Sequence, residues 1–290
     1  MLSFDLHTHS TASDGTLSPS ELVRLARSAN VRVLALTDHD TTAGLDEARQ
    51  AAAAAGIRLL AGVETSVTWG GRTVHVLGLG VDPHCGVLGR GLAHLQAFRA
   101  WRAAEIGRRL DKQGVQGTCA QAAALARGHL IGRGHFARVL VQRGLAPDER
   151  AVFRHFMVRG KPGYVPGQWA PLEDAVSWIR AAGGRAVLAH PARYRLTRTK
   201  LRRLLSDFVA AGGEGLEVVC ASHSRDDCFV MARHARDFGL LASLGSDYHG
   251  PDSPRAALGG LPALPPGCVP IWHDWQAPLK GSHSAPENPP

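Results

Sequence analysis

The segment Phe4-Asp5-Leu6-His7-Thr8-His9 lies a few residues after Met1 and places two histidines directly after a short apolar run. We predict a strand over Phe4 to Leu6. Because side chains alternate along a strand, His7 and His9 should share one face, where their imidazoles can bind the same cation. Asp14 follows shortly afterwards and adds a carboxylate to this region.

Six later apolar runs carry metal-binding residue types at or near their ends. These runs and residues are Val31 to Leu36 with Thr37-Asp38-His39-Asp40, Ile57 to Val63 with Glu64, Val74 to Leu77 with His75, Ala186 to Ala189 with His190, Leu216-Glu217-Val218-Val219 with His223, and Leu241 to Gly245 with Ser246-Asp247-Tyr248-His249. A single His-x-His pair is weak evidence for a metal, but seven such placements are unusual for ordinary polar contacts. Mixed imidazole and carboxylate ligands favour manganese, zinc or iron over magnesium or calcium.

Strands and helices are predicted to alternate along most of the chain. Ser18, Pro19 and Glu21 are typical of a helix start, and this helix should run to about Ala29. Further helices are predicted at 43–55, 171–182, 199–211 and 225–238, each followed by an apolar run. This order is typical of parallel βα units, whose carboxyl ends would gather the polar residues at one mouth of a closed or nearly closed barrel. An open doubly wound sheet is the alternative, but it gathers ligands at one switch point rather than around all strands.

The middle of the chain interrupts the alternation. Residues 91–160 are basic and show a helical pattern, which predicts an inserted helical subdomain within a discontinuous barrel domain at 1–90 and 161–275. The last residues, 276–290, are rich in proline and polar residues and are predicted to be disordered.

Length and composition suit an enzyme-sized protein. The chain has 290 residues, a mass of 30.9 kDa and 44% hydrophobic residues, so it can bury a large core. No apolar stretch is long enough to span a membrane, and Met1 leads directly into the first strand, so we expect a cytoplasmic protein with no membrane partner. The five cysteines form no Cys-x-x-Cys pair and are expected to be reduced thiols.

The net charge of +8 indicates an anionic partner. Much of the excess is arginine in the central region and again at 193–203, where it forms either a solvated helix face or an attractive surface for phosphates. Proteins that bind duplex DNA usually contain a recognisable reading helix or aromatic platform, and neither is evident here. The sequence therefore favours a small phosphorylated substrate over duplex DNA.

The motifs together resemble those of the PHP (polymerase and histidinol phosphatase) family, and they occur in the same order. The matching stretches are 5–10, 13–15, 37–40, 62–64, 190–191 and 245–249. The resemblance covers roughly Leu2 to Trp272 and implies a distorted (β/α)7 barrel with an inserted helical subdomain and a trinuclear metal centre. Three divalent ions are implied, with manganese favoured and zinc or iron as alternatives.

The insert is similar to that of the branch of the family that acts on nucleoside 3′,5′-bisphosphates, through residues 131–137, 159–166 and 190–194. One difference is Gly134, where the branch usually has proline. Carried over residue by residue, the resemblance implies three overlapping ligand sets and five further site residues. The metal sets are His7, His9, Glu64 and Asp247; Glu64, His75 and His190; and Asp14, His39 and His249. Phosphate would be bound by Arg133, Lys161, Arg193 and His135. The leaving-group acid would be His135 or His223.

The implied activity is hydrolysis of the 3′-phosphate of nucleoside 3′,5′-bisphosphates by a metal-activated water, without a covalent enzyme intermediate. Short single-stranded oligonucleotides are a further implied substrate. The alternatives are a histidinol-phosphate or other phosphomonoester phosphatase and a non-enzymatic metal-binding module. Asp5, Asp38 and Asp40 are expected to orient imidazoles or to position loops, since metal-bound histidines commonly donate their other nitrogen to such groups.

Overall fold

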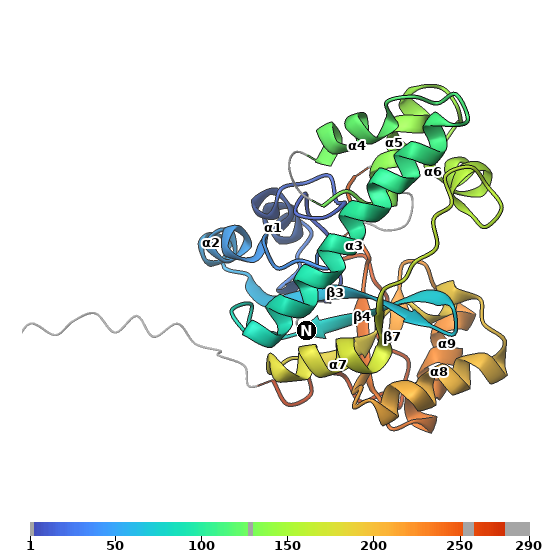
Figure 1. Ribbon diagram of the computed structural model, residues 1–290. Helices are drawn as coiled ribbons and strands as arrows, with labels where there is room; N and C mark the ends of the chain where they lie inside the picture. The colour runs from blue at the N-terminus through green and yellow to red at the C-terminus, as the bar shows by residue number, and fades with distance from the viewer. Residues whose placement is uncertain (1–2, 127–129, 252–257, 276–290) are drawn as a thin grey trace, which may run out of the picture.

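The strands of the computed structural model form a nearly closed barrel, seen in Figure 1 with the helices around it. The structure describes residues 3–126, 130–251 and 258–275, so the tail predicted at 276–290 lies outside the described residues. Around the barrel the strands are β1 (Phe4–Asp5), β2 (Val33–Leu36), β3 (Arg58–Trp69), β4 (Arg72–Leu79), β6 (Arg185–Leu188), β7 (Gly215–Cys220) and β8 (Leu241–Gly245), while the short β5 (Ala170–Pro171) pairs with β3 outside this order.

The first and last strands close the barrel. The Leu6 N–H donates to the Leu244 carbonyl at 3.1 Å, and the Asp247 N–H donates to the His7 carbonyl at 2.9 Å. Thr8 and Tyr248 form a parallel bridge just beyond the strands. The segment with His7 and His9 is therefore held directly beside the segment with Asp247. The predicted barrel is confirmed.

The prediction that the strands are all parallel is wrong for β4. This strand runs antiparallel to both of its neighbours, β3 and β6. The reason is the turn at Gly70 and Gly71, whose φ angles are +54° and +72°. Two successive residues with positive φ are what a tight hairpin turn requires, so β3 continues to Trp69 and returns at once as β4.

The helices around the barrel begin and end close to the predicted residues. They are α1 (Pro19–Ser28), α2 (Leu45–Ala55), α7 (Leu172–Ala181), α8 (Arg198–Ala210) and α9 (Arg225–Asp237), with the short 3₁₀ turn η2 (Pro191–Tyr194) after β6. The predicted cap of α1 is present, because the Ser18 hydroxyl accepts from the Glu21 N–H at 3.2 Å and the Glu21 carboxylate accepts from the Ser18 N–H at 2.8 Å.

The central region is helical. It contains α3 (Gly86–Asp111), α4 (Thr118–Ala126), α5 (Arg133–Gln142), α6 (Glu149–Val152) and the π-helical turn η1 (Phe153–Met157). Figure 1 shows α3 running from beside α7 up to α4, α5 and α6. Leu88, Leu92 and Leu95 in its first half belong to the apolar cluster that the strands form with α7, α8 and α9, whereas Ile106 and Leu110 belong to a separate apolar cluster with α5. The helix α3 therefore joins the barrel to the other helices. Residue 91, where the insert was predicted to begin, lies inside α3.

Apolar side chains fill the barrel interior below the mouth. Leu6, Ala35, Leu77, Val187 and Ala189 are fully buried there and belong to one cluster. The polar residues in and after the strands lie next to this packing, at the mouth. No described helix is both long enough and apolar enough to cross a membrane.

Candidate metal centre

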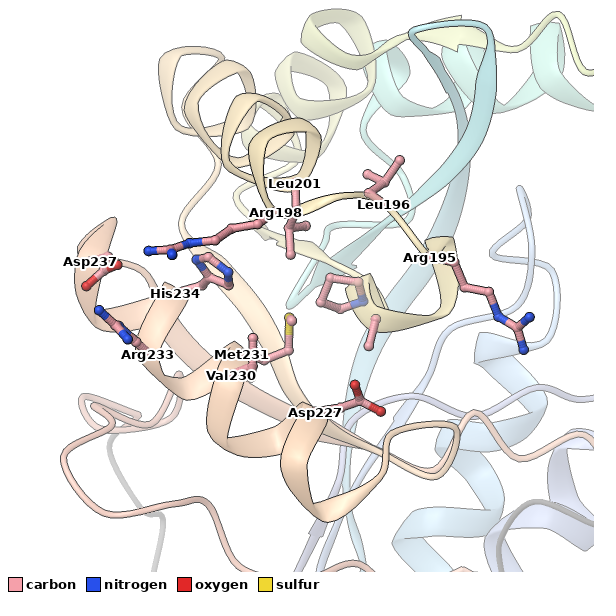
Figure 2. A pocket seen from close by; sticks show the side chains of 12 residues that line it. Arg195, Leu196, Arg198, Leu201, Asp227, Val230, Met231, Arg233, His234 and Asp237 are labelled. Atoms are coloured by element: carbon pink, nitrogen blue, oxygen red, sulfur yellow. The ribbon is translucent and has the colours of Figure 1, made fainter.

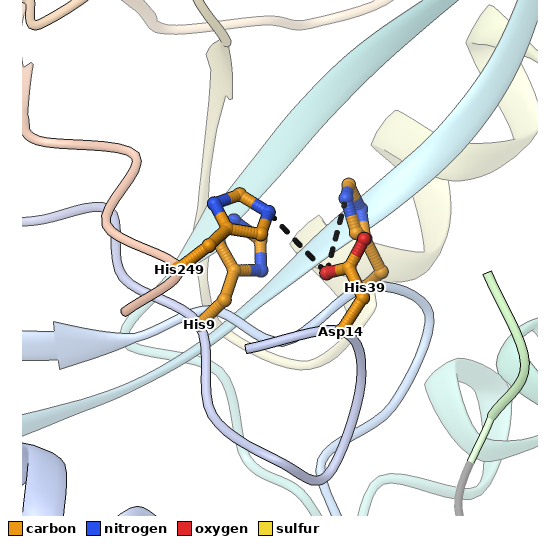
Figure 3. Close-up of side chains that lie close together, drawn as sticks. All are labelled: His9, Asp14, His39 and His249. Atoms are coloured by element: carbon orange, nitrogen blue, oxygen red, sulfur yellow. Dashed lines mark ion pairs between the residues drawn. The ribbon is translucent and has the colours of Figure 1, made fainter. Parts of the chain in front are cut away.

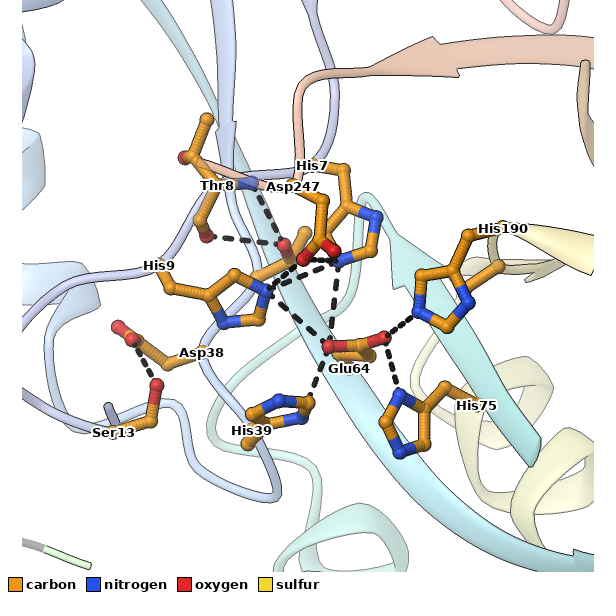
Figure 4. A network of polar contacts seen from close by, with 12 residues as sticks. His7, Thr8, His9, Ser13, Asp38, His39, Glu64, His75, His190 and Asp247 are labelled. Atoms are coloured by element: carbon orange, nitrogen blue, oxygen red, sulfur yellow. Dashed lines mark hydrogen bonds and ion pairs between the residues drawn. The ribbon is translucent and has the colours of Figure 1, made fainter. Parts of the chain in front are cut away.

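The strand ends bring the predicted metal ligands together at one mouth of the barrel. Figure 4 shows imidazoles from several strands gathered around the Glu64 carboxylate. Within the described residues, three groups have ligand atoms that all lie within 4.8 Å of one another. These groups are His7, His9, Glu64 and Asp247; His9, Asp14, His39 and His249; and His39, Glu64 and His75.

The first group is identical to a predicted set. The Nε2 atoms of His7 and His9 lie 3.1 Å apart, and Glu64 Oε2 is 3.3 Å from each of them. Asp247 Oδ1 completes the group at 3.5 Å from His7 Nε2 and 3.3 Å from His9 Nε2. All four side chains are nearly inaccessible to solvent. Two nitrogens and two oxygens thus face one small space, as a cation with mixed ligands requires.

The second group contains the predicted Asp14, His39 and His249, together with His9 (Figure 3). Asp14 Oδ1 lies 3.3 Å from His249 Nε2 and 3.9 Å from His39 Nε2. The His9 ring stacks on the His249 ring with a centroid distance of 4.1 Å. His9 therefore lies between the first two groups and can serve either one.

The third group differs in membership from the predicted set of Glu64, His75 and His190. His75 Nδ1 and His190 Nε2 both approach Glu64 Oε1, at 2.8 and 3.1 Å. However, the atoms that are mutually close are those of Glu64, His75 and His39, and His39 Nδ1 lies 2.9 Å from Glu64 Oε2. Glu64 contacts all three imidazoles through its two oxygens, an arrangement in which a carboxylate can bridge cations.

The surrounding imidazoles hold the central carboxylates in their charged form. Burial alone would raise the pKa of Glu64, but the charges of His39, His75 and His7 outweigh it and hold this pKa well below its usual value. The pKa of Asp14 is lowered in the same way, with His249 and His39 overcoming the effect of burial. Ionised carboxylates at the centre of the cluster are the form that binds divalent cations.

Several buried polar atoms in the cluster have no hydrogen-bond partner among the described residues. They include Glu64 Oε2, His39 Nδ1 and His190 Nδ1. Glu64 Oε2 and His39 Nδ1 lie close together, yet their orientation does not make a hydrogen bond. Buried polar atoms are normally paired, and lone pairs that converge without protons between them are suited to a cation. The residues present therefore fit a metal centre.

Three residues near the mouth have backbone conformations that non-glycine residues rarely adopt. The φ angles of Asp40, His190 and Asp247 are +53°, +30° and +54°. Such conformations cost roughly 1–3 kcal/mol each and persist where the surrounding structure holds them, which is often at functional sites. The contacts of the mouth therefore impose these side-chain directions.

Glu217, which was not among the predicted site residues, holds two of the predicted ligands. Its Oε1 lies 3.0 Å from His7 Nδ1, and its Oε2 accepts from the His190 N–H at 2.6 Å. Space for it depends on Gly245, where a Cβ atom would lie 2.8 Å from Glu217 Oε1 and 2.2 Å from His7 Cβ. The signal in the sequence was a charged residue inside the apolar run Leu216 to Val219.

The three aspartates expected to orient imidazoles or to position loops contact loop residues, and Asp40 accepts from the Ser66 N–H at 2.7 Å. Asp38 accepts from the Ser10 N–H and from the hydroxyls of Ser10 and Ser13, and Asp5 accepts from the Ser246 N–H. Of the two expected roles, these contacts correspond to loop positioning, while Glu217 contacts an imidazole.

Arginines from the insert reach the same loops, which the sequence did not indicate. Arg99 on α3 donates through Nε to Asp40 Oδ2 at 2.5 Å and through Nη2 to the Ser66 hydroxyl at 2.9 Å. Arg138 on α5 donates to the Asp14 carbonyl at 3.0 Å. The insert is therefore tied directly to the loops after β1 and β2 that carry Asp14 and His39.

Two of the predicted phosphate-binding residues lie beside the cluster. Arg193 Nη1 donates to Asp247 Oδ2 at 2.8 Å, and its side chain is 43% exposed. Arg133 lies between Gly132 and Gly134, whose Cβ positions would be 3.5 and 3.6 Å from Asp14 Oδ2. Burial, together with the nearby positive charges of Arg193 and Arg99, lowers the pKa of Arg133 to about 10. Arg99 and Arg193 are paired with Asp40 and Asp247, but their charges still act on Arg133, so an anion beside Arg133 is favourable.

The other three predicted substrate-binding or acid residues, Lys161, His135 and His223, differ in exposure and in contacts. Lys161 is exposed, and no described side chain of the cluster makes a hydrogen bond or ion pair with it. His135 is buried, and its Nδ1 accepts from the Gly132 N–H at 3.0 Å, which leaves the proton on Nε2. His223 Nδ1 lies 3.1 Å from the Val218 carbonyl, so it carries the proton, while its Nε2 is buried without a described partner.

Comparison with known proteins gives the family. A model described as "PHP domain" matches residues 5–154. A 3′,5′-nucleoside bisphosphate phosphatase from Chromobacterium violaceum is 49% identical over 279 residues, which cover 96% of this chain and 98% of that protein. The chain belongs to the PHP family. A 5′-3′ exoribonuclease from Haemophilus influenzae is 43% identical over 93% of this chain and 97% of its own length.

Solved structures of PHP-family relatives share the fold. A chain from Chromobacterium violaceum, described as an amidohydrolase with bound SO4 and no metal, has a TM-score of 0.90 at 49% identity and covers 93% of this chain and 94% of its own. A putative metal-dependent phosphoesterase from Bifidobacterium adolescentis has a TM-score of 0.80 at 29% identity, covering 88% and 91%. The predicted enzyme class, a metal-dependent phosphoric ester hydrolase, is confirmed.

Proposed function

We propose that this PHP protein removes the 3′-phosphate from nucleoside 3′,5′-bisphosphates. The observation that carries the proposal is the position of Arg133 and Arg193 beside the ligand cluster, because two cations next to a metal centre can hold the two phosphates of such a substrate. The relative named as a 3′,5′-nucleoside bisphosphate phosphatase supports the same substrate class.

We infer three ion positions from the ligand groups. One ion would be held by His7, His9, Glu64 and Asp247, a second by Asp14, His39 and His249, and a third by Glu64, His75 and His190 with His39 close by. Divalent ions there, with manganese favoured over zinc or iron, would lower the pKa of a water and neutralise charge on the phosphoryl oxygens during in-line displacement.

The chain's own groups would orient the phosphates. Arg193 lies against Asp247, and its remaining N–H groups would bind one phosphate, while Arg133 would bind the second. His135 is suited to donating a hydrogen bond from Nε2, because its Nδ1 already accepts from Gly132. His223 would need a second proton, on Nε2, before it could protonate the leaving oxygen. Lys161 stays a weaker candidate, since its side chain is exposed.

The same attack would also shorten RNA from its 5′ end. If the 3′-phosphorus of a 5′-phosphorylated terminal nucleotide is attacked by water and its bond to O3′ breaks, a nucleoside 5′-phosphate with a 3′-hydroxyl leaves. The attacked phosphate then remains as the new 5′-phosphate of the shortened strand. The only difference from a bisphosphate is that one oxygen of the attacked phosphate is esterified to the next nucleotide. The relatives named as exoribonucleases support this extension.

A substrate panel tests the proposal. The manganese-loaded protein should release phosphate from a nucleoside 3′,5′-bisphosphate much faster than from histidinol phosphate or from a nucleoside 3′-monophosphate lacking the 5′-phosphate. The variant His7→Ala should lose turnover on every substrate. No release from bisphosphates by the loaded protein would reject the proposal, and equal rates on all phosphomonoesters would reject the substrate class.

A pair of arginine variants tests the second phosphate site. Arg133→Ala should raise KM for the bisphosphate roughly tenfold or more, because a lost charge-assisted hydrogen bond typically costs about 1.5–3 kcal/mol. Arg150→Ala removes an equally charged, exposed residue from α6 of the same insert and should leave KM unchanged. If both variants behave alike, Arg133 does not bind phosphate.

A further inference from the structure

A cavity lies directly behind the turn that carries the mouth residues His190 and Arg193. Its volume is about 540 Å³, and it is formed by η2, the start of α8 and one face of α9 (Figure 2). Pro191 and Ala192 line it, so the turn η2 has the metal cluster on one side and this cavity on the other. None of the residues that we assign to the phosphatase site lines this cavity.

The cavity is lined by cations that have no carboxylate partner. Arg195, Arg198 and Arg233 are exposed and make no side-chain hydrogen bond or ion pair with the described part of the chain. The acidic residues of the lining are engaged elsewhere: Asp227 accepts from the Ser224 hydroxyl at 2.7 Å, and Asp237 pairs with Arg202 at 3.1 Å. The lining therefore favours an anion.

The remaining lining is apolar and includes an unpaired buried imidazole. Leu201 and Met231 are buried, and Val230 is 49% exposed on the wall of the cavity. His234 is only 5% exposed, and its Nδ1 has no hydrogen-bond partner in the described structure. Figure 2 shows its ring beside Arg198. Apolar walls beside arginines suit a nucleobase attached to a phosphate.

A second cavity continues the first along α8. Its volume is about 240 Å³, and the two cavities share Leu196. Its lining adds the cations Arg72, Lys200 and Arg203, together with Trp69 and Asp207, which accepts from Trp69 Nε1 at 2.8 Å. We call the two cavities together the side groove. In Figure 2, Arg195 points away from the group of Arg198, Arg233 and His234, so the cations of the first cavity are spread along it rather than gathered at one point.

We propose that the side groove binds the nucleotides that follow the scissile phosphate of a single-stranded RNA whose 5′ end lies at the metal centre. The proposal rests on the function proposed above, because it places the part of an oligonucleotide that a bisphosphate lacks. During the reaction, the strand would be attached through the O5′ oxygen of its next nucleotide to the phosphate held near Arg193. Arg195 lies two residues after Arg193 and lines the first cavity, so among the groove cations it follows that phosphate site most closely along the chain.

A bound RNA strand accounts for the charges that line both cavities of the side groove better than a separate small effector does. A single nucleotide would occupy the larger cavity alone and leave the cations of the smaller one unused. A flexible polyanion can follow both, with phosphates at the exposed arginines and bases against Val230, Met231 and Trp69. Binding of this kind does not depend on the base, because the described groove offers mostly charges and apolar surface.

The test compares substrates of increasing length on the full, manganese-loaded chain. The probes are a nucleoside 3′,5′-bisphosphate and 5′-phosphorylated RNA of two, three and five nucleotides. For the wild type, KM should fall with length. In the double variant Arg198→Ala with Arg233→Ala, KM for the five-nucleotide RNA should rise about tenfold, while KM for the bisphosphate stays the same because that substrate ends at the metal centre. Val230→Glu, which adds a negative charge to the wall without removing a cation, should have the same selective effect.

Salt dependence gives a second, independent measurement. On single strands, each phosphate neutralised by a cation contributes about −0.7 to the slope of log affinity against log salt. The double variant should therefore reduce the slope for the five-nucleotide RNA by about 1.4. The matched control is Arg24→Ala with Arg27→Ala, which removes two exposed arginines from α1, away from the groove, and should change neither KM nor slope.

The outcomes separate the two proposals. If the wild type does not hydrolyse the bisphosphate, the proposed function fails, whatever the groove does. If the bisphosphate is hydrolysed but KM is independent of RNA length, or the double variant affects all substrates equally, the groove proposal alone fails. It also fails if an added nucleoside 5′-phosphate alters bisphosphate turnover in the wild type and not in the double variant, because the groove would then be an effector site.

Discussion

Individual residues at the mouth have two roles: some would bind a cation, and others position the side chains that would bind it. Glu217 belongs to the second kind, since one carboxylate oxygen contacts the His7 ring and the other accepts from the His190 backbone. His190 has a rare backbone conformation with φ of +30°, and this hydrogen bond helps to hold it. Conservative changes at Glu217 should therefore alter metal binding without removing any ligand.

We expect Glu217→Gln to weaken Mn²⁺ binding by about 10- to 100-fold. A glutamine has only one accepting oxygen, so either the His7 Nδ1–H or the His190 N–H loses its acceptor. Titration calorimetry on the metal-stripped protein measures the effect. Glu214→Gln, a change of the same type at a partly exposed position just before β7, should keep wild-type affinity. An unchanged affinity in Glu217→Gln would show that its contacts do not position the ligands.

His135 should make the folded state sensitive to acid. Burial lowers its pKa to about 4, although Asp14 nearby favours the charged form. Above pH 6.5 the imidazole is neutral in both the folded and the unfolded chain and has no effect. As the pH falls from 6.5 towards 4, only the unfolded chain takes up the proton, so stability is lost. At pH 5 the loss should be about 2 kcal/mol relative to His135→Gln.

Urea unfolding of both proteins at pH 7 and pH 5 measures this difference. The free-energy gap between wild type and His135→Gln should shift in favour of the variant at the lower pH. A gap that is the same at both pH values would mean that His135 titrates normally. A neutral His135 at pH 7 also favours hydrogen-bond donation to phosphate over proton transfer as its role.

Two glycines of α3, Gly89 and Gly91, allow the effects of helix propensity and of packing on stability to be measured separately. A Cβ atom at Gly91 would lie 2.3 Å from the Trp178 ring on α7, whereas a Cβ atom at Gly89 would meet nothing within 4 Å. We expect Gly91→Ala to destabilise the protein by about 1–3 kcal/mol through overpacking. We expect Gly89→Ala to stabilise it by about 0.5–1 kcal/mol. Thermal unfolding compares the two, and a stabilising Gly91→Ala would contradict the close approach of α3 to α7.

Elements with local signals were predicted well, and those set by distant contacts were not. The Ser18 cap and the helices around the barrel depend on neighbours in the sequence and appear close to the predicted residues. The length of β3 and the reversed direction of β4 were missed, although Gly70 and Gly71 carried a hairpin signal. The contacts of Arg99 and Arg138 with the mouth could not be predicted, because the sequence pattern of a basic helix does not reveal whether an arginine faces solvent or another part of the chain.

For the whole molecule, metal binding should be coupled to stability because the ligands come from segments far apart in the chain. Mn²⁺ at about 100 times its dissociation constant should stabilise the metal-stripped protein by about 2.7 kcal/mol, or roughly 5 °C or more in Tm. Mg²⁺ at the same concentration should have a smaller effect, because it prefers oxygen ligands and the cluster is rich in imidazole. Differential scanning calorimetry measures both, and an equal shift or none would contradict a nitrogen-rich centre.

The sequence by itself determined the kind of protein: metal-binding residues at the ends of successive apolar runs favoured a barrel mouth over an open sheet, and the order of the motifs resembled that of the PHP family. It determined these things because strand ends and residue types are local properties. The tertiary structure alone decided which ligands face one another, with His39 joining His75 and His190 around Glu64, and that Glu217 holds two of them from inside a strand. It also decided that a groove lies behind η2. These are distances between segments far apart in the chain, and they exist only once the barrel has closed.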